Sequence, residues 1–233
     1  MSISIIIPTL NEERYIGRLL KYLKNDQSYQ LVTEILVVDG RSDDRTRILA
    51  SELGARVISS AVRHRAVQMN LGAAKATGTI LYFLHADTFP PREFASRILQ
   101  AVGTGCHCGC FRLKFNWDHW FLGANSWFTR FNFQVFRYGD QSLFVGRHAF
   151  FKVGGFKQEL KLFEDQDIVV RLKRAYSFVV LPDYVVTSAR KYRRNGPYRL
   201  QLVYYWLYLL FALGFSQKTI LKTYHKLIPC PMI

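Results

Sequence analysis

Four short apolar runs alternate with helical segments in the first 90 residues, and this alternation constrains the fold more than any other feature. The runs cover residues 2–7, 34–40, 55–60 and 80–84. The runs at 2–7, 34–40 and 80–84 are typical of strands buried on both faces of a parallel sheet. The segment ARVISS at 55–60 predicts a further strand. Because helices separate them, the sequence predicts right-handed crossovers and a Rossmann-like nucleotide-binding half.

Polar or acidic residues stand where three of these runs end. They are Thr9, Asn11 and Glu12 after the first run, Asp39 at the end of the second, and His85 and Asp87 after the fourth. Ligands of open α/β sheets bind at the carboxyl ends of the strands. Such groups can bind a base and a ribose, and the Asp87 carboxylate suits a divalent cation on a diphosphate. A competing interpretation makes Asp87 the cap of a helix that begins near Pro90 or Pro91.

The helices between the runs have start signals of their own. Asn11 is predicted to cap the first helix and Ser42 the second, with Asp43 and Asp44 in its first turn, where acids suit the helix dipole. The sequence contains neither a GxGxxG after the first run nor a GxxxxGK[ST]. Without these phosphate loops, a dinucleotide oxidoreductase or a P-loop enzyme is disfavoured.

The second half of the chain is less regular. We expect helices over 91–102 and 162–174, and strands over 108–115, 142–146, 178–181 and 184–187. The helix over 162–174 has Glu164, Asp165 and Asp167 in its first turn. These acids complement the helix dipole, or one of them faces a substrate proton or a metal, where a shifted pKa is useful.

The net charge of +15 attracts anions, which include nucleic acid, acidic membranes and phosphorylated small molecules. The basic residues are spread along the chain without a nucleic-acid-binding motif, so no nucleic-acid partner is expected. Cys106, Cys108 and Cys110 alternate as in a strand, and with Cys230 they are expected to be free thiols. The chain begins without a signal-peptide pattern, which predicts a reducing, cytoplasmic location.

The last part of the chain is basic and then apolar. Residues 188–199 contain five Lys or Arg residues, and residues 200–217 contain none and no acid. The apolar part is shorter than the roughly 20 residues that cross a bilayer, and its tyrosines and Trp206 are typical of a membrane interface. Peripheral contact of residues 200–216 with the inner face of a membrane competes with core packing or a homo-oligomer contact.

The motifs IIIPTLNEE, ILVVDGRSDD, the HAD strand end and FEDQD resemble, in this order, glycosyltransferase family 2. RAVQMNLGA, YGDQSLFV and TSARKYRRNG are similar to its bacterial arsenosugar-biosynthesis-type branch. The resemblance covers about residues 3–190 and implies an α/β chain with the GT-A (Rossmann-like) fold, a mixed, mainly parallel sheet with flanking helices. It implies a nucleotide-binding half (1–90), an acceptor half (91–190), and a helical tail (191–233) with a C-terminal apolar helix.

The resemblance also implies roles for the residues that match its motifs. Those lining the nucleotide pocket would be Pro8, Thr9, Asn11, Glu12 and Asp39. Asp39 would accept a hydrogen bond from the base, typically uracil. Asp87 would coordinate Mg²⁺ or Mn²⁺ on the diphosphate. His85 occupies the place of the signature's first acid, and histidine suits Mn²⁺ better than Mg²⁺.

Asp165 would be the general base that deprotonates the acceptor hydroxyl, with Glu164 as the alternate. The residues near the donor sugar or the acceptor would be Gly139, Asp140, Gln141 and Arg190. The diphosphate would contact Arg65, Arg190 or Arg194.

The expected activity is inverting transfer of a hexose from a nucleotide-diphospho-sugar, typically UDP-linked, to the hydroxyl of an acceptor that is unknown and could be lipid-linked. The first alternative is a nucleotidyltransferase-like enzyme, which would normally show a glycine-rich signature where PTLNEE stands. The second is a non-catalytic nucleotide-sugar-binding module, against which the presence of Asp39, Asp87 and Asp165 together argues.

Overall fold

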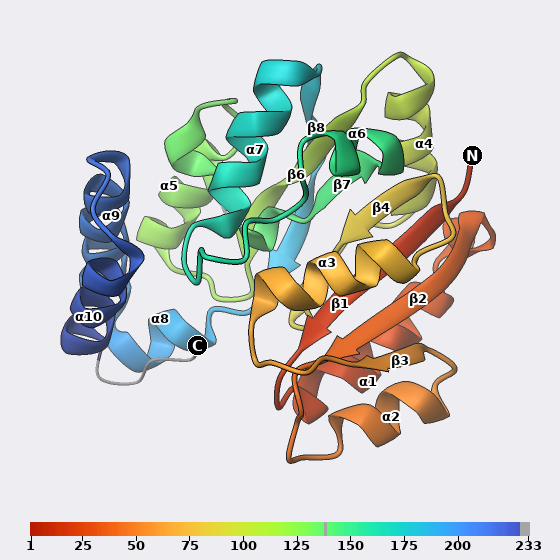
Figure 1. Cartoon of the computed structure of the whole chain (residues 1–233), viewed down its shortest axis with the longest axis horizontal. Coiled ribbons are helices and arrows are strands. Elements are labelled where there is room, and N and C mark those ends of the chain that lie inside the picture. Colours follow the sequence, from red (N-terminus) through yellow and green to blue (C-terminus); the bar gives the residue numbers. More distant parts are fainter. Residues whose placement is uncertain (138, 229–233) are drawn as a thin grey trace.

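One sheet of eight strands runs through the described part of this computed structural model, residues 1–137 and 139–228 (Figure 1). Its strand order is β3-β2-β1-β4-β7-β6-β8-β5. The strands are β1 (Ile3–Thr9), β2 (Val32–Asp39), β3 (Arg56–Ser59), β4 (Ile80–Phe83), β5 (Thr88–Phe89), β6 (Cys108–Phe115), β7 (Leu143–Gly146) and β8 (Phe178–Thr187). The first four are parallel, β7 pairs antiparallel with β4 and β6, and β8 pairs parallel with β6 and antiparallel with β5. The sheet is therefore mixed and mainly parallel, as the sequence predicts.

Helices cover both faces of the sheet. One face packs against α1 (Glu13–Lys24), α2 (Thr46–Glu52), α4 (Phe94–Gly103) and α5 (Trp120–Phe128), and the other against α3 (Arg65–Lys75), α6 (Arg147–Lys152) and α7 (Glu164–Ala175). Successive side chains of a strand point to opposite faces, so Ile5 and Ile7 enter the first core and Ile6 the second. This two-sided burial explains why the first strand is continuously apolar. Short 3₁₀ helices cover Gln27–Leu31, Gln134–Phe136 and Gly139–Gln141.

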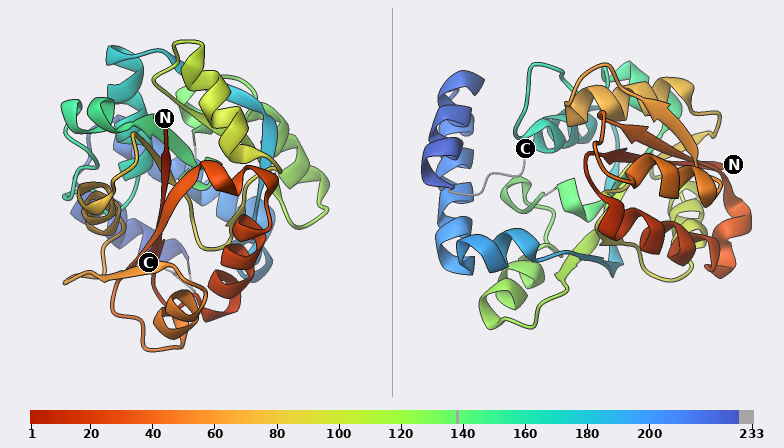
Figure 2. Two further views of the ribbon diagram at one scale, coloured as in Figure 1. Left: turned by 90° about the vertical axis from the view of Figure 1, so that its right-hand side faces the viewer. Right: turned by 90° about the horizontal axis from the view of Figure 1, so that it is seen from below.

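The last three helices are α8 (Arg190–Asn195), α9 (Pro197–Ala212) and α10 (Gln217–Leu227). The pair α9 and α10 lies at the end of the molecule opposite the N-terminus (Figure 2). Leu207 of α9 and Ile220 of α10 are buried in the first core, so these helices pack on the preceding part of the chain. Within residues 1–137 and 139–228, every helix is too short or too polar to cross a membrane.

Several local sequence predictions are wrong. Asn11 does not cap α1; it has a φ of 55° and accepts a hydrogen bond from the Asp43 N–H. Helix α2 begins at Thr46, so Ser42 and Asp43 precede it, and Asp44 binds the Thr46 N–H.

The helix expected from residue 91 begins at Phe94 instead. Its first N–H groups bind distant residues: Asp26 accepts from the Glu93 N–H, and the Ser28 hydroxyl accepts from the Ala95 N–H. The interpretation of Asp87 as the cap of this helix is therefore wrong.

The two strands expected over 178–187 form the single strand β8. Its pairing with β6 skips from Leu181 to Tyr184, so Pro182, which has no N–H to donate, lies in an irregularity of the ladder. Cys106, Cys108 and Cys110 are free thiols, as predicted, whereas Cys230 lies outside the described residues.

Candidate active site

The ends of the parallel strands meet at one edge of the sheet. In the ladder between β1 and β2, Thr9 pairs with Asp39. Buried Gln68 of α3 ties these strand ends together, because its Nε2 donates 2.8 Å hydrogen bonds to the carbonyls of Thr9 and Val38. The Asp39 carboxylate accepts from the hydroxyls of Thr9 and Ser42 and from the Ser42 N–H. Asp39 is fully buried, and these hydrogen bonds hold the ends of β1 and β2 in position.

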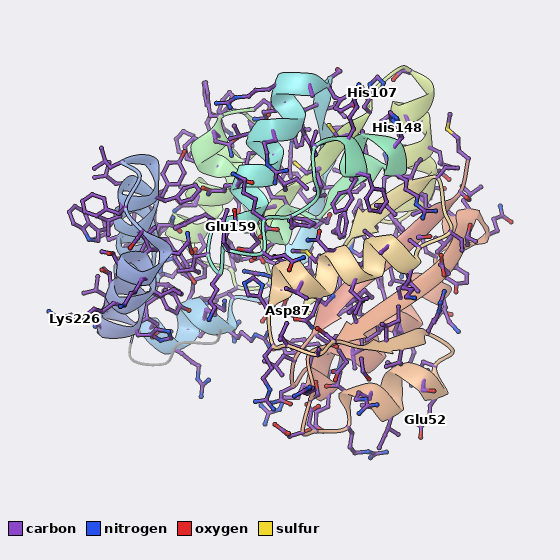
Figure 3. The ribbon with its side chains drawn as sticks, viewed as in Figure 1. Glu52, Asp87, His107, His148, Glu159 and Lys226 are labelled. Carbon is purple, nitrogen blue, oxygen red and sulfur yellow. The ribbon has the colours of Figure 1, made fainter. Side chains whose placement is uncertain are left out.

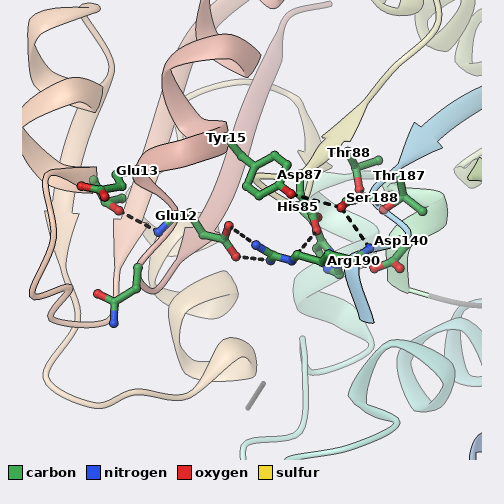
Figure 4. Close-up of polar contacts among 12 residues, drawn as sticks. Glu12, Glu13, Tyr15, His85, Asp87, Thr88, Asp140, Thr187, Ser188 and Arg190 are labelled. Atoms are coloured by element: carbon green, nitrogen blue, oxygen red, sulfur yellow. Dashed lines mark hydrogen bonds and ion pairs between the residues drawn. The ribbon is translucent and has the colours of Figure 1, made fainter. Parts of the chain in front are cut away.

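Strand β5 brings the end of the fourth apolar run next to α8. Thr88 of β5 pairs with Thr187 of β8, and the Ser188 N–H donates to the Asp87 carbonyl. Arg190 consequently reaches both strand ends: its Nε lies 3.3 Å from Asp87 Oδ2, and its two terminal nitrogens bind the Glu12 carboxylate (Figure 4). Such a bidentate ion pair between a guanidinium and a carboxylate is strong and directional. Asp87 lies near the centre of the molecule, whereas Lys226 of α10 lies at its edge (Figure 3).

His85 and Asp140 form a second polar pair beside Asp87. His85 Nδ1 lies 2.7 Å from Asp140 Oδ1. Burial alone would lower the pKa of His85, but the hydrogen bond to Asp140 raises it. Burial would raise the pKa of Asp140, yet the hydrogen bond and charge of His85, with the charge of Lys191, lower it well below its usual range. Burial, and then the charge of Asp140, raise the pKa of Asp87.

Asp165 lies in the first turn of α7, directly against Gly139. The turn follows Phe163, whose φ of 69° redirects the chain into the helix. A Cβ placed on Gly139 would lie 2.0 Å from Asp165 Oδ2, so only glycine leaves room for this carboxylate. Burial, and then the charge of Glu164, raise the pKa of Asp165 to about 6. A carboxylate with such a pKa is suited to accept a proton near neutral pH.

The other two acids of this turn have structural partners. Glu164 is 1% exposed and accepts a 2.6 Å hydrogen bond from Arg65 Nε, so it positions that arginine. Asp167 forms ion pairs with Lys157 at 3.0 Å and with Arg171 at 2.6 Å. Of the three acids, Asp165 is the one whose side chain borders the cavity.

Replacement of Gly139 by alanine should displace Asp165, the general base that the sequence predicts. The new methyl group would overlap the Asp165 carboxylate, which has to rotate away from the cavity. We expect at least about a hundredfold loss of the turnover rate, the size of effect when a general base is displaced. Gly123→Ala is the matched control, since a Cβ there meets no atom within 4 Å. Equal activity of the two variants would contradict this placement of Asp165.

A cavity of about 550 Å³ joins these groups. Residues predicted from the sequence that line it are Pro8, Thr9, Asn11, Glu12, Arg65, His85, Asp87, Gly139, Asp140, Asp165 and Arg190. Four predicted residues are not part of its lining: Asp39, Gln141, Glu164 and Arg194. Gln141 borders a small adjoining cavity together with Asp165. The two strand ends, α7 and α8 thus face a common space.

Sequence reasoning missed several residues of this cavity. Lys191 lines it, and burial, then the charge of Arg65, lower its pKa. Its place in the run RKYRR suggests a solvated surface, and only its position directly after Arg190 pointed to the site. Gln201 and Tyr204 of α9 also line the cavity, although a largely apolar helix gives no sign of this.

The C-terminal helices also contact the segment that carries Asp165. The ring of Phe163 stacks on that of Phe211 of α9, with centroids 5.1 Å apart. Gln217 of α10 accepts hydrogen bonds from the N–H groups of Lys161 and Leu162 and donates one to the Leu162 carbonyl. The position of the first turn of α7 therefore depends on α9 and α10.

Comparison with known sequences indicates that the chain is a glycosyltransferase. The family model described as glycosyl transferase family 2 matches residues 4–163, more than half of the chain. A dolichyl N-acetyl-alpha-D-glucosaminyl phosphate 3-beta-D-2,3-diacetamido-2,3-dideoxy-beta-D-glucuronosyltransferase of Methanococcus voltae is 32% identical over 105 residues, 42% of this chain and 33% of that protein. A 4,4'-diaponeurosporenoate glycosyltransferase of Staphylococcus haemolyticus is 38% identical over 108 residues, 43% of this chain and 27% of that protein. The chain thus spans a third or less of these relatives' length.

Solved structures show the same fold at low sequence identity. The mannosyltransferase PcManGT of Pyrobaculum calidifontis, in complex with GDP-Man and Mn²⁺, has a TM-score of 0.71 at 18% identity, covering 97% of this chain and 69% of that one. TarS 1-349 of S. aureus, in complex with UDP-GlcNAc, has a TM-score of 0.67 at 19% identity, covering 81% and 58%. With the family match, these likenesses confirm the predicted GT-A architecture, whereas the arsenosugar-type branch stays a prediction. The chain belongs to glycosyl transferase family 2.

Proposed function

We propose that this protein transfers a hexose from a nucleotide-diphospho-sugar to an acceptor hydroxyl, with inversion at the anomeric carbon. The observation that carries the proposal is the position of Asp165. This half-buried carboxylate, with a pKa of about 6, faces the same cavity as a cluster of cations at the sheet edge. A base and an anion site on one cavity are the two parts that single-step displacement of a diphosphate requires.

The cations of the cavity stabilise the leaving group. When the bond between the anomeric carbon and the diphosphate oxygen breaks, its electron pair stays on the diphosphate. Arg65, Arg190 and Lys191 line the cavity and supply positive charge for this oxygen. The carboxylates of Glu12 and Glu164 bind two of these cations and thereby orient them.

Asp165 acts on the acceptor. Its carboxylate removes the proton from the acceptor hydroxyl as the oxygen attacks the anomeric carbon from the face opposite the diphosphate. The new glycosidic bond therefore has the inverted configuration, and the proton ends on Asp165. Glu164, bound to Arg65, positions that arginine in place of its predicted role as alternate base.

The donor set at the sheet edge fits a divalent cation, Mg²⁺ or Mn²⁺. In residues 1–137 and 139–228, no three His, Cys, Asp or Glu side chains are grouped to bind a metal by themselves. Mg²⁺ in nucleotide sites is commonly bound by one or two carboxylates together with phosphate oxygens, and Asp87 supplies such a carboxylate. A bound cation would neutralise charge on the diphosphate. His85, whose Nδ1 binds Asp140, has only its Nε2 left for a metal.

The nucleotide is proposed to lie along Pro8, Thr9 and Asn11, with uracil as the base. The deciding experiment incubates the protein with UDP- and GDP-linked hexoses in Mn²⁺ or Mg²⁺ and measures binding and slow donor hydrolysis. We expect metal-dependent binding of a UDP-sugar. Binding of no donor under any of these conditions would refute the proposal.

The outer face of α9 is proposed to contact an anionic membrane. Leu202, Trp206 and Leu213 of this face are exposed, and the neighbouring α5 exposes Trp120, whose ring lies 6.0 Å from that of Tyr198. The chain has no Asp or Glu after Asp183 and none over residues 119–139. Exposed aromatics on a segment rich in Lys and Arg are typical of proteins that bind the interface of an acidic bilayer. The name of the M. voltae relative, which contains a dolichyl phosphate, agrees with an acceptor at a membrane.

Vesicle binding tests this contact. Partition onto vesicles of phosphatidylglycerol and phosphatidylcholine should exceed partition onto phosphatidylcholine alone and fall with salt, because basic residues contribute. The double variant Leu202→Ser/Trp206→Ser should bind at least about tenfold more weakly, since two apolar side chains no longer enter the interface. Phe151→Ser on α6 removes an exposed aromatic elsewhere and serves as the control. Equal partition of both variants would contradict the proposed face.

A further inference from the structure

The cavity has two ends of different chemistry. One end is charged and contains Asp87, Arg190 and Lys191, which suit a diphosphate. The other end is apolar and aromatic, and we call its lining the inner wall: Leu113 and Phe115 of β6 with Tyr204, Leu207 and Tyr208 of α9. The diphosphate and the hydroxyl groups of a hexose are polar, and such groups gain nothing from contact with the apolar side chains of the inner wall.

The inner wall begins next to the reacting groups. Tyr204 lines the same cavity as Asp140 and Asp165, and burial, then Tyr224, and then the charge of Asp140 raise its pKa. The ring of Tyr208 lies 6.1 Å from that of Phe163, the residue before the first turn of α7. A molecule whose hydroxyl reaches Asp165 therefore continues along the inner wall.

Gln201 provides a polar contact in this apolar end. It is 1% exposed and lines the cavity, and its Oε1 accepts a 2.7 Å hydrogen bond from the Tyr192 hydroxyl. Its Nε2 is buried without a hydrogen-bond partner among residues 1–137 and 139–228. A buried N–H without a partner is unfavourable, so this amide points to an oxygen atom supplied by a ligand.

We propose that the acceptor is a hydroxylated amphiphile. Its polar head places a hydroxyl at Asp165 and an oxygen at Gln201, and its apolar chain or ring packs against the inner wall. This assignment rests on the proposed function, because it identifies the inner wall as the acceptor side of the same cavity. The opposite, outward face of α9 is the proposed membrane contact, so the inner wall and this contact belong to the same helix.

The test compares soluble glucosides that share one head. Binding of methyl, octyl and phenyl β-glucoside to the UDP-bound protein is measured by saturation-transfer NMR, with octyl glucoside below its micelle concentration. We expect octyl or phenyl glucoside to bind at least about tenfold more tightly than methyl glucoside, since part of the added apolar surface leaves water. Tighter binding of octyl glucoside identifies a lipid-like chain, and tighter binding of phenyl glucoside identifies a flat ring. Equal affinity of all three would overturn the proposal.

Three variants locate the binding site of the glucosides. Tyr204→Ala/Tyr208→Ala should lose the preference for an apolar group at least about tenfold, whereas Leu202→Ala, on the outer face of the same helix, should keep it. Loss of the preference for an apolar group in Leu202→Ala alone would place the amphiphile on the outer face of α9 and overturn the assignment. Gln201→Leu should weaken binding of every glucoside, because the head loses its N–H donor.

Calorimetric titration of UDP into the same samples distinguishes a failure of the proposed function from a failure of the amphiphile proposal. Absent UDP binding counts against the proposed function, and the glucosides are then compared on the protein without UDP. Intact UDP binding without a preference for an apolar group counts against the amphiphile alone.

Discussion

Asp165→Asn should lower the rate of sugar transfer by about 10²- to 10⁴-fold while the protein stays folded. Asparagine has nearly the same shape but cannot take the acceptor proton, and general bases contribute about this much. In the wild-type protein, transfer should rise with pH through about 6, because the proposed base Asp165 accepts a proton only in its ionised form. The measurement is the pH dependence of kcat/KM for both proteins.

Stability should change with pH in the opposite sense to activity. The pKa of Asp165 is raised from 3.8 to about 6 in the folded protein, so the folded state binds more protons than the unfolded state between these values. Its contribution therefore lowers stability as pH rises across this window. At pH 7, Asp165→Asn should have an unfolding midpoint equal to or above that of the wild type.

Asp167→Asn is the matched control. Asp167 lies in the same turn but forms ion pairs with Lys157 and Arg171. This variant should keep the rate of transfer and lose stability, the reverse of Asp165→Asn. If Asp167→Asn were the inactive variant and Asp165→Asn the active one, the assignment of the base would be wrong.

Asp87→Asn should lower transfer at least about a hundredfold and remove its response to divalent cations. In the wild-type protein, chelation should stop transfer, and Mn²⁺ or Mg²⁺ should restore it. In the variant, added metal should not restore it, because an amide is a poorer ligand for a hard cation than a carboxylate. Titration of transfer rate against metal concentration measures both effects.

Acid should weaken the metal response of the wild type as well. Burial and the charge of Asp140 raise the pKa of Asp87, so its ligand form is lost at a higher pH than for an ordinary aspartate. Asp183→Asn, which removes the partner of Arg97, serves as the control. Transfer in the wild type that is indifferent to chelation would refute the metal proposal and leave the role of Asp165 untouched.

The parallel half of the sheet could be predicted because its signals are local. Each buried strand is a continuous apolar run, and each strand end is marked by a polar residue such as Thr9 or Asp87. The pairing of Thr88 with Thr187 could not be predicted, since two strands that meet through two residues leave no pattern. That pairing is what brings Arg190 to Asp87.

The limits of sequence reasoning at the site have similar causes. Glu164 and Asp165 are neighbours, and only the packing of α7 decides which of them faces the cavity. Helix α9 is apolar on nearly all sides, so its periodicity does not separate the inner wall from the outer face. Lys191 resembles a surface cation until the position of α8 is known.

The link between Glu12 and Arg190 joins residues 178 positions apart, and it implies an order of events during synthesis. The first βα units can form from nearby contacts as they leave the ribosome, because domains begin to fold from the N-terminal side. Arg190, Lys191 and α9 emerge after these units, so the strand ends of the nucleotide edge are synthesised before the rest of the cavity lining. A chain truncated before residue 190 would therefore lack Arg190, Lys191 and α9 from the lining of the cavity, even where its nucleotide edge had formed.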